Sequence, residues 1–232
     1  MTRRYFVPDL PRNGGLVPLP SEEAQHAIRV MRIRVDDPMT LFDGCGYEAE
    51  ATVISLGRNK CQCQAEVASA INREPACKVH MAIALPKPDR AKELVERLTE
   101  LGVASLTPIL GKRSQRPPKD TFLEKLRRAS VEACKQSGRN QLMEIHDTVS
   151  AIDYFESTIE GPRLIAHPTQ STASLDSFRN APVLTTAIGP EGGWTDEEIE
   201  IATRHGFLGV DLGSRIYRIE TAAVVVAAVL VT

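Results

Sequence analysis

AIGPEGGWTDEEIEIATRHG, residues 187–206, is the stretch that decides the fold of the second part of this chain. It continues an apolar, β-branched run from Val183 to Ile188, which predicts a buried strand. Three glycines and a proline fill the turn 189–193, and Thr195-x-x-Glu198 is a capping box that starts a helix. Ligands of open α/β sheets bind where the strands end. We therefore expect a ligand at this turn, with an empty, tight turn as the alternative.

The turn does not have the pattern of a phosphate-binding loop. It matches neither G-x-G-x-x-G nor G-x-x-x-x-G-K-[ST]. Asp196 and Glu197 already occupy the positive start of the following helix, where a phosphate would bind. The expected ligand is therefore not held by a diphosphate.

A second glycine loop, residues 213–221, follows the last apolar strand and leads into an apolar segment. Both loops leave the carboxyl end of a strand, so we expect them to line one pocket. Arg215 and Arg218 are three residues apart and could direct a cation at an RNA phosphate or at a developing oxyanion. The alternative is that both form ordinary salt bridges with the acidic helix start.

Strands and helices alternate from about residue 73 onwards, which predicts an α/β fold with a parallel sheet covered on both faces. We expect strands in 78–86, 104–110, 162–168, 182–190 and 207–213, and helices in 90–102, 120–138 and 195–206. The tail TAAVVVAAVLVT has the valines of a strand and the alanines of a buried helix. We expect a helix there, capped by Thr221.

Residues 1–72 lack the alternation of strands and helices seen after residue 73, and their pattern predicts a small β-barrel. Short alternating segments are separated by turn residues such as Asp43-Gly44. One helix is expected from Ser21, with this serine as its N-cap and an acidic first turn. With 232 residues, 42% of them hydrophobic, the chain can build both this domain and a larger one over 73–232.

The formal net charge is −2, but basic residues gather in two regions, 1–34 and 111–139. Such regions are typical of a surface that binds a polyanion, and equally of solvated faces balanced by acid elsewhere. The five cysteines are odd in number and irregularly spaced, which favours free thiols over disulfides or a metal site. Because the first residues lack the apolar run of a signal peptide, we expect a cytoplasmic protein.

The two glycine loops together identify a family. AIGPEGGWTDEEI followed by LGSRIYRIETAAVVVAAVL resembles the RsmE family, bacterial 16S ribosomal RNA uridine-N3 methyltransferases of the SPOUT superfamily. The resemblance extends over essentially the whole chain. It includes the motifs RRYFVP, 26–32 (HAIRVMR), 42–47 (FDGCGY), ALPK, 132–139 (EACKQSGR) and His167-Pro168.

The resemblance implies a PUA-like RNA-binding barrel, a SPOUT sheet with a C-terminal trefoil knot, and a homodimer. It implies S-adenosylmethionine as cofactor and uridine 1498 in the decoding region of 16S rRNA as target, with no metal and no membrane. The implied cofactor residues are His167, Ile188, Gly189, Pro190, Gly193, Leu212, Gly213, Ile216, Tyr217 and Arg218. The implied RNA-binding residues are Arg3, Arg4, Arg29, Arg32, Arg34, Lys87, Arg113 and Arg139, the last two beside the pocket.

The chemistry requires a group that offsets negative charge on the uracil and a group that accepts the N3 proton. Our candidates are Arg215 or Arg218 for the first role and Glu191 for the second. For Glu191 the alternative is a loop carboxylate bonded to nearby backbone N–H groups.

The chain departs from the family's usual pattern at Pro88, Lys135, Ser214, Tyr217 and Ile219, and most of all over GKRSQRPPK after Leu110. These differences affect the expected contacts with RNA more than the cofactor loops. Two other functions stay open: a SPOUT methyltransferase for tRNA ribose 2′-O or guanine, and a non-catalytic RNA-binding protein with this fold.

Overall fold

The computed structural model describes residues 3–114, 117–158, 160–167 and 173–231, so Arg116 and Pro168 lie outside the described residues. It divides into two compact units. The first unit contains residues 1–74 together with 131–142, and the second contains 75–130 and 143–232. The boundary expected near residue 73 stays a prediction, although the first break between units falls after Glu74.

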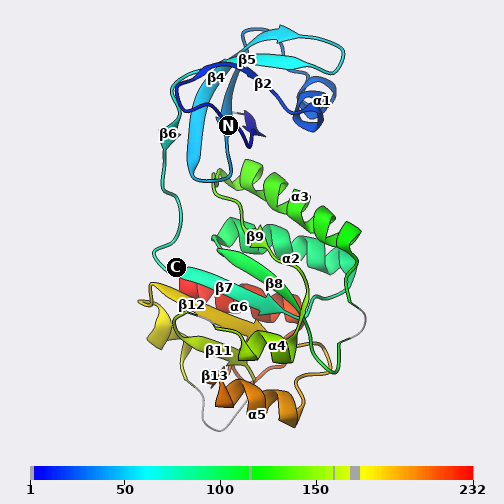
Figure 1. Ribbon diagram of the computed structural model, residues 1–232, viewed down its shortest axis with the longest axis vertical. Coiled ribbons are helices and arrows are strands. Elements are labelled where there is room, and N and C mark those ends of the chain that lie inside the picture. Colours follow the sequence, from blue (N-terminus) through cyan, green and yellow to red (C-terminus); the bar gives the residue numbers. More distant parts are fainter. Residues whose placement is uncertain (1–2, 115–116, 159, 168–172, 232) are drawn as a thin grey trace. The chain divides into compact units, whose positions relative to one another are not determined.

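The first unit contains a six-stranded, mostly antiparallel sheet with the order β1-β3-β4-β5-β2, and β6 pairs with β4 (Figure 1). Its strands are β1 (Arg3–Phe6), β2 (Gly15–Pro18), β3 (Pro38–Phe42), β4 (Tyr47–Leu56), β5 (Cys61–Ala65) and β6 (Ser69–Ala70). Cys61 and Cys63 alternate with exposed glutamines along β5, so both thiols enter the core beside Met39. Every second residue of this strand therefore faces the core, in agreement with the alternation in the sequence.

Helix α1 (Ser21–Arg29) begins one residue earlier than the sequence indicated. Pro20, with an extended backbone, is the N-cap, and its carbonyl accepts the first helical hydrogen bond from the N–H of Ala24 at 2.8 Å. The expectation that Ser21 is the cap is therefore wrong. Proline fits this position because it lacks an N–H and disfavours helix before it.

Residues 131–142 are tied to the rest of the first unit by polar contacts. The Lys135 ammonium lies 3.1 Å from both carboxylate oxygens of Glu23, and its side chain is only 5% exposed. The Arg139 guanidinium forms a fork with Glu74, and the Asn140 amide donates to the carbonyls of Gly46 and Ile71. The 132–139 motif therefore has a structural task in this unit.

The second unit is built on a fully parallel sheet, which confirms the expected α/β class. The strand order is β10-β8-β7-β12-β11-β13, with β9 beside β8. The strands are β7 (Lys78–Ile83), β8 (Ser105–Leu110), β9 (Glu144–Ile145), β10 (Val149–Ser150), β11 (Arg163–Ala166), β12 (Val183–Ile188) and β13 (Phe207–Val210). The last three strands along the chain thus form one side of the sheet.

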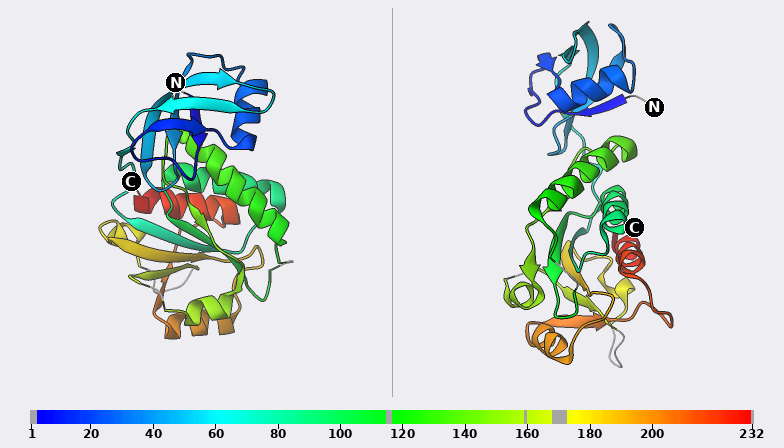
Figure 2. Two further views of the ribbon diagram at one scale, coloured as in Figure 1. Left: turned by 45° about the horizontal axis from the view of Figure 1, so that its top comes forward. Right: turned by 90° about the vertical axis from the view of Figure 1, so that its right-hand side faces the viewer.

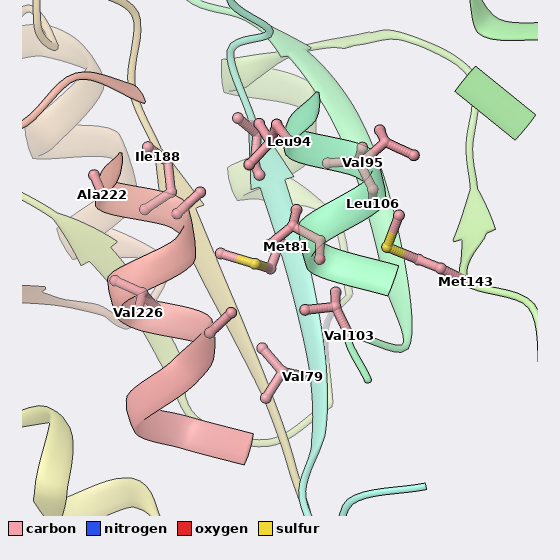
Figure 3. Packing of buried hydrophobic residues seen from close by; sticks show 14 of the residues in the cluster. Val79, Met81, Leu94, Val95, Val103, Leu106, Met143, Ile188, Ala222 and Val226 are labelled. Atoms are coloured by element: carbon pink, nitrogen blue, oxygen red, sulfur yellow. The ribbon is translucent and has the colours of Figure 1, made fainter. Parts of the chain in front are cut away.

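Helices cover both faces of this sheet (Figures 1 and 2). α2 (Pro88–Leu101), α3 (Asp120–Ser137) and α6 (Ile219–Val231) contribute to the larger core, whereas α4 (Ala151–Glu156) and α5 (Asp196–Arg204) contribute to the smaller one. A short 3₁₀ helix, η1 (Leu175–Phe178), packs near α6. Figure 3 shows Val79 and Met81 of β7 facing Val226 and its neighbours on α6. Ala82 of the same strand joins the opposite core.

The tail is a helix, as expected, but its start differs. α6 begins at Ile219, and the carbonyl of Arg218 accepts from the N–H of Ala222 at 2.9 Å. Thr221 therefore lies inside the first turn, and its assignment as the cap is wrong. The sequence also gave no sign of α4, whose cap is the hydroxyl of Ser150 accepting from the N–H of Asp153. No described helix is long and apolar enough to cross a bilayer.

Glu48 joins β4 to two arginines in the first unit. Its carboxylate accepts from Arg4 at 2.9 Å and from Arg73 at 2.7 and 2.8 Å. Burial alone would raise the pKa of this carboxyl, but the hydrogen bonds from Arg73 and Arg4 outweigh it and lower that pKa. The ion pair therefore stabilises the folded state fully above the ordinary carboxyl pKa, and this is lost as the pH falls through the folded-state value.

We expect Glu48→Gln to lower the free energy of unfolding by about 1–3 kcal/mol near neutral pH, since it leaves Arg4 without its charge partner. Denaturant unfolding from about pH 7 down to about pH 3 should show a smaller loss of stability on acidification in the variant than in the parent. Glu66→Gln, the same change at an exposed site, is the control. Parallel pH profiles for parent and E48Q would contradict this account.

Candidate active site

A cavity of about 570 Å³ opens where β11, β12 and β13 end. Ala166 pairs with Ile188 on one side and with Val210 on the other, so the three strands end level with one another. The loops that leave β12 and β13 form the walls of the cavity. The two glycine-containing loops that the sequence indicated are therefore brought together at the carboxyl edge of the sheet.

The lining of this cavity includes every residue expected at the cofactor and every candidate for catalysis. These residues are His167, Ile188, Gly189, Pro190, Glu191, Gly193, Leu212, Gly213, Arg215, Ile216, Tyr217 and Arg218. A volume of several hundred Å³ is the usual size of a small-molecule site.

The first loop is shaped by Trp194, a residue to which the sequence analysis gave no role. Its indole is 5% exposed, packs edge-on against Phe155 and donates from Nε1 to the carbonyl of Ala166 at 3.2 Å. A Cβ on Gly189 would lie 2.8 Å from the indole ring. Gly189 is therefore required by the packing of Trp194 against the loop.

Residues 111–114, directly after β8, hold this loop from the other side. Arg113 donates to the carbonyls of Gly192 and Trp194 at 2.9 and 3.1 Å. The backbone N–H of Lys112 donates to the carboxylate of Glu198 at 2.7 Å, while its ammonium pairs with Glu197. We call residues 111–114 the clasp, because they fix both the 189–194 loop and the start of α5.

Glu198 is 1% exposed, and it completes the capping box expected from the sequence. It accepts from both the backbone N–H and the hydroxyl of Thr195, in addition to the clasp. One buried carboxylate thus satisfies the helix start and the neighbouring loop. The negative charge at this helix start is used internally, in agreement with the absence of a phosphate-binding pattern.

The second loop forms the open rim. The N–H of Gly213 donates to the Asp211 carboxylate at 3.0 Å, and its φ of +108° is strained for any other residue. Ile216 is fully exposed although it is a large apolar side chain, and Tyr217 is half-buried. Both side chains line the cavity, so they are available to a bound molecule.

The three candidate catalytic residues all lie on this rim or on the opposite wall. Arg215, Arg218 and Glu191 are exposed, and none of them forms a salt bridge within the described part of the chain. The alternative of salt bridges between the two arginines and the acidic start of α5 is not realised, since Glu197 pairs with Lys112 and Glu198 with the clasp. Their charges are therefore available to a ligand.

His167 directly follows β11, and its backbone N–H donates to the carbonyl of Val210 at 3.1 Å. Its side chain is half-buried in the cavity lining. Within the described residues, no three His, Cys, Asp or Glu side chains gather as a metal site. The five cysteines are free thiols.

The residues expected to bind RNA differ in their surroundings. Arg3 pairs with Asp37, Arg4 with Glu48 and Arg139 with Glu74, and the side chains of Arg4 and Arg139 are nearly buried. Arg139 belongs to the first unit, and Arg113 is part of the clasp. That Arg139 lies beside the pocket stays a prediction. Arg29, Arg32, Arg34 and Lys87 are exposed.

The departures from the family pattern have local explanations. Pro88 is the first residue of α2, where proline costs nothing because that N–H has no helical partner. Lys135 pairs with Glu23 and Glu132. Tyr217 lines the cavity, Ser214 is exposed on the rim, and Ile219 is buried at the start of α6.

A double-mutant cycle tests the packing of Gly189. We expect Gly189→Ala to lower the free energy of unfolding by about 1–3 kcal/mol, because the new methyl group overlaps the Trp194 ring. Combined with Trp194→Ala, which removes the ring that the Cβ would overlap, the same change should cost clearly less. Chemical denaturation of the four proteins measures the coupling. Additive losses would refute the packing of Trp194 as the reason for this glycine.

Two family models match the chain. The RNA methyltransferase domain matches residues 72–231, and the RNA methyltransferase PUA domain matches residues 19–66. Among curated relatives, ribosomal RNA small subunit methyltransferase E of Synechocystis is 32% identical over 91% of this chain and 71% of its own length. The protein of the same name from Bacillus subtilis is 30% identical over 87% and 84%.

Two solved structures agree over nearly the whole length. A putative methyltransferase from Legionella pneumophila in complex with the bound cofactor SAM is 31% identical, with a TM-score of 0.94 over 99% of this chain and 97% of that one. The ribosomal RNA small subunit methyltransferase E from Neisseria gonorrhoeae, bound to S-adenosyl methionine, is 26% identical with a TM-score of 0.91 over 98% and 96%. With a family model over residues 72–231 and relatives of this similarity, the chain belongs to the RNA methyltransferase family, in the group of the ribosomal RNA small subunit methyltransferases E.

Proposed function

We propose that this protein transfers a methyl group from S-adenosylmethionine to N3 of a uridine in 16S rRNA, at position 1498 of the decoding region. The observation that carries the proposal is one cavity in which both glycine loops meet three charged residues that form no salt bridge among the described residues. The names of the relatives, which specify small-subunit ribosomal RNA, support the substrate class.

The lining of the cavity fits S-adenosylmethionine. Ile188, Leu212 and Ile219 offer apolar surface to a purine, and glycines at 193 and 213 bring main chain to the wall without a Cβ. Glu197 and Glu198 at the α5 start are engaged in the clasp, and the two carboxylates that line the cavity, Glu191 and Asp211, are both exposed. When bound, S-adenosylmethionine supplies a sulfonium methyl group that is already activated for transfer, so the protein needs no covalent nucleophile.

The remaining work falls to side chains of the chain itself. The site must hold the uracil so that N3 faces the methyl group, which is an effect of orientation. Arg215 or Arg218 stabilises the negative charge that spreads onto O2 and O4 of the ring. Glu191 accepts the N3 proton, directly or through water, and it lies in the cavity wall opposite that rim.

The target base must leave its stack before N3 can be reached. The first unit, which contains the PUA-family match, supplies the RNA-binding platform in this proposal, and we expect its sheet to close as a PUA-like barrel. Arg29, Arg32 and Arg34, all exposed in this unit, are the residues proposed to track phosphates. Because 16S rRNA is the substrate, we place the protein in the cytoplasm.

We infer that the C-terminal segment forms the trefoil knot of the SPOUT superfamily. β13 lies at the edge of the sheet, yet α6, which follows it, packs against α2 and β7 beyond β12 and β11. The chain therefore returns from the edge to the middle of the sheet after its last strand. Such a return, past the loops that line the cavity, supports a threaded arrangement, one of the rare exceptions to unknotted connections.

The protein acts as a homodimer in this proposal, and α6 provides the contact. Hydrophobic residues occupy nearly the whole circumference of this helix, which is typical of a helix buried on all sides. Val224, Val225, Ala228, Val229 and Val231 are nevertheless only half-buried. A second copy covering this stripe would bury it.

The function is tested in cells that lack their own enzyme for this modification. Expression of this chain should restore 3-methyluridine in the 16S rRNA fragment that contains position 1498, as read by mass spectrometry. Arg218→Ala or Arg215→Ala should lower the rate of methyl transfer by about a hundredfold for the arginine that contacts the uracil. Glu191→Gln should lower the rate by about a hundredfold as well.

The control is Arg204→Ala, which changes an exposed arginine of α5 in the second unit and should leave the rate unchanged. A modified ribose or guanine in tRNA instead would favour the second enzyme hypothesis. Unmodified RNA of both kinds, with RNA binding retained, would favour the non-catalytic protein. Full turnover in all three variants would remove these residues from the mechanism.

The dimer is tested by charge on α6. Val225→Lys with Val229→Lys should convert the protein to a monomer in sedimentation experiments, since lysine is disfavoured in an apolar interface. Leu208→Lys, at an exposed leucine of β13, is the matched control. A protein that is monomeric before any substitution, or a dimer that persists in the double variant with native circular dichroism, would contradict the assignment.

A further inference from the structure

A second cavity, of about 710 Å³, lies at the same edge of the sheet as the first. It opens at the ends of β7 and β8, and its floor includes Ala84 and Ile109. Pro190 and Glu191 line both cavities, so the 189–194 loop is a wall common to the two. A molecule that fills the second cavity therefore reaches the candidate proton acceptor of the first.

Three lysines line this second cavity, against Glu191 as the acidic residue of the lining. Lys87, Lys119 and Lys125 are exposed, and none of them forms a salt bridge within the described chain. This separates them from the basic residues that pair with carboxylates, such as Lys112 and Lys135. Unpaired cations around an apolar hollow favour an anionic ligand with apolar parts.

The walls are apolar and rigid. Six lining residues are prolines: Pro86, Pro88, Pro108, Pro117, Pro118 and Pro190. Proline has no N–H and a fixed φ, so such a wall keeps its shape and offers no backbone hydrogen-bond donor. The half-buried ring of Phe122 also lines the cavity, and it is anchored on the larger core of the unit. An aromatic ring among lysines is the usual platform for the bases of single-stranded RNA.

Two of the lysines have a fixed main chain. Lys87 is the N-cap of α2, and its carbonyl accepts from Ala91 at 2.9 Å. The carbonyl of Lys119 accepts from Phe122 and Leu123 at 2.8 and 3.2 Å at the start of α3. The acidic residues that follow each lysine in sequence do not line the cavity. The positions of these cations are therefore set by helix ends and do not depend on a loop.

We propose that this second cavity binds the nucleotides next to the target uridine. A base stacks on Phe122, the phosphates contact Lys119 and Lys125, and Lys87 lies on the same lining. The target uracil then lies at Glu191, where the two cavities meet. This proposal rests on the proposed function, and it assigns a substrate-positioning role to residues 117–125.

The test combines a salt titration with crosslinking. Lys119→Gln with Lys125→Gln should weaken binding of single-stranded RNA from the target region about tenfold at low salt, and should reduce the slope of log affinity against log salt by about 1.4. Affinity for S-adenosylmethionine, measured by calorimetry, should not change. Lys92→Gln with Arg97→Gln on α2 makes the same change of charge at exposed positions outside the lining and should leave the slope as it is.

RNA that carries 4-thiouridine beside the target should crosslink to the fragment 120–125, which contains Phe122. The assignment is overturned if the slope is unchanged in the lysine variant, or if crosslinks map elsewhere. It is also overturned if the lysine variant alters dimer dissociation but not RNA affinity, since the occupant would then be a second copy. RNA that binds and crosslinks here without being methylated refutes the proposed function and leaves this assignment standing.

Discussion

The contact between Gly189 and the indole of Trp194 is the constraint on which the arrangement of the site depends. Without a Cβ at residue 189, the indole fits beneath the loop and donates to the carbonyl of Ala166 at the end of β11. One side chain thus links the ends of two strands and the start of α5. The clasp fixes the same loop from β8 through Arg113. Because these contacts are internal, the wall between the two cavities is in place before any ligand binds.

Much of the second unit could be predicted from the sequence because its signals are local. Gly102, with positive φ, ends α2, and Thr195 and Glu198 start α5 as expected. The meeting of the two glycine loops followed from a general property of parallel sheets. Errors arose where a helix start depends on backbone rather than side-chain capping, as at Pro20 and Arg218. The short α4 carries too few residues for a periodic signal.

Tertiary contacts are what the sequence could not supply. The sequence does not distinguish buried from exposed basic residues within 1–34 and 111–139. In the structure, Arg4 and Arg139 are nearly buried and pair with carboxylates more than forty residues away in the chain. Trp194 and the clasp were missed for the same reason, because their partners come from other elements. The second cavity joins prolines and lysines from three separate stretches of chain, and no spacing within one stretch indicates it.

The pairing of charges separates structural from functional cations in this protein. Carboxylates with little exposure to solvent form salt bridges with arginines and with Lys135. These pairs neutralise charges that would otherwise be costly to bury. Five cations that form no salt bridge among the described residues line the two cavities, with Arg215 and Arg218 on one and three lysines on the other. Glu191 lies on the wall that both cavities share. An anionic strand that bridges both cavities would meet positive charge on either side of that carboxylate. The path of such a strand would therefore pass the group that is proposed to accept the N3 proton.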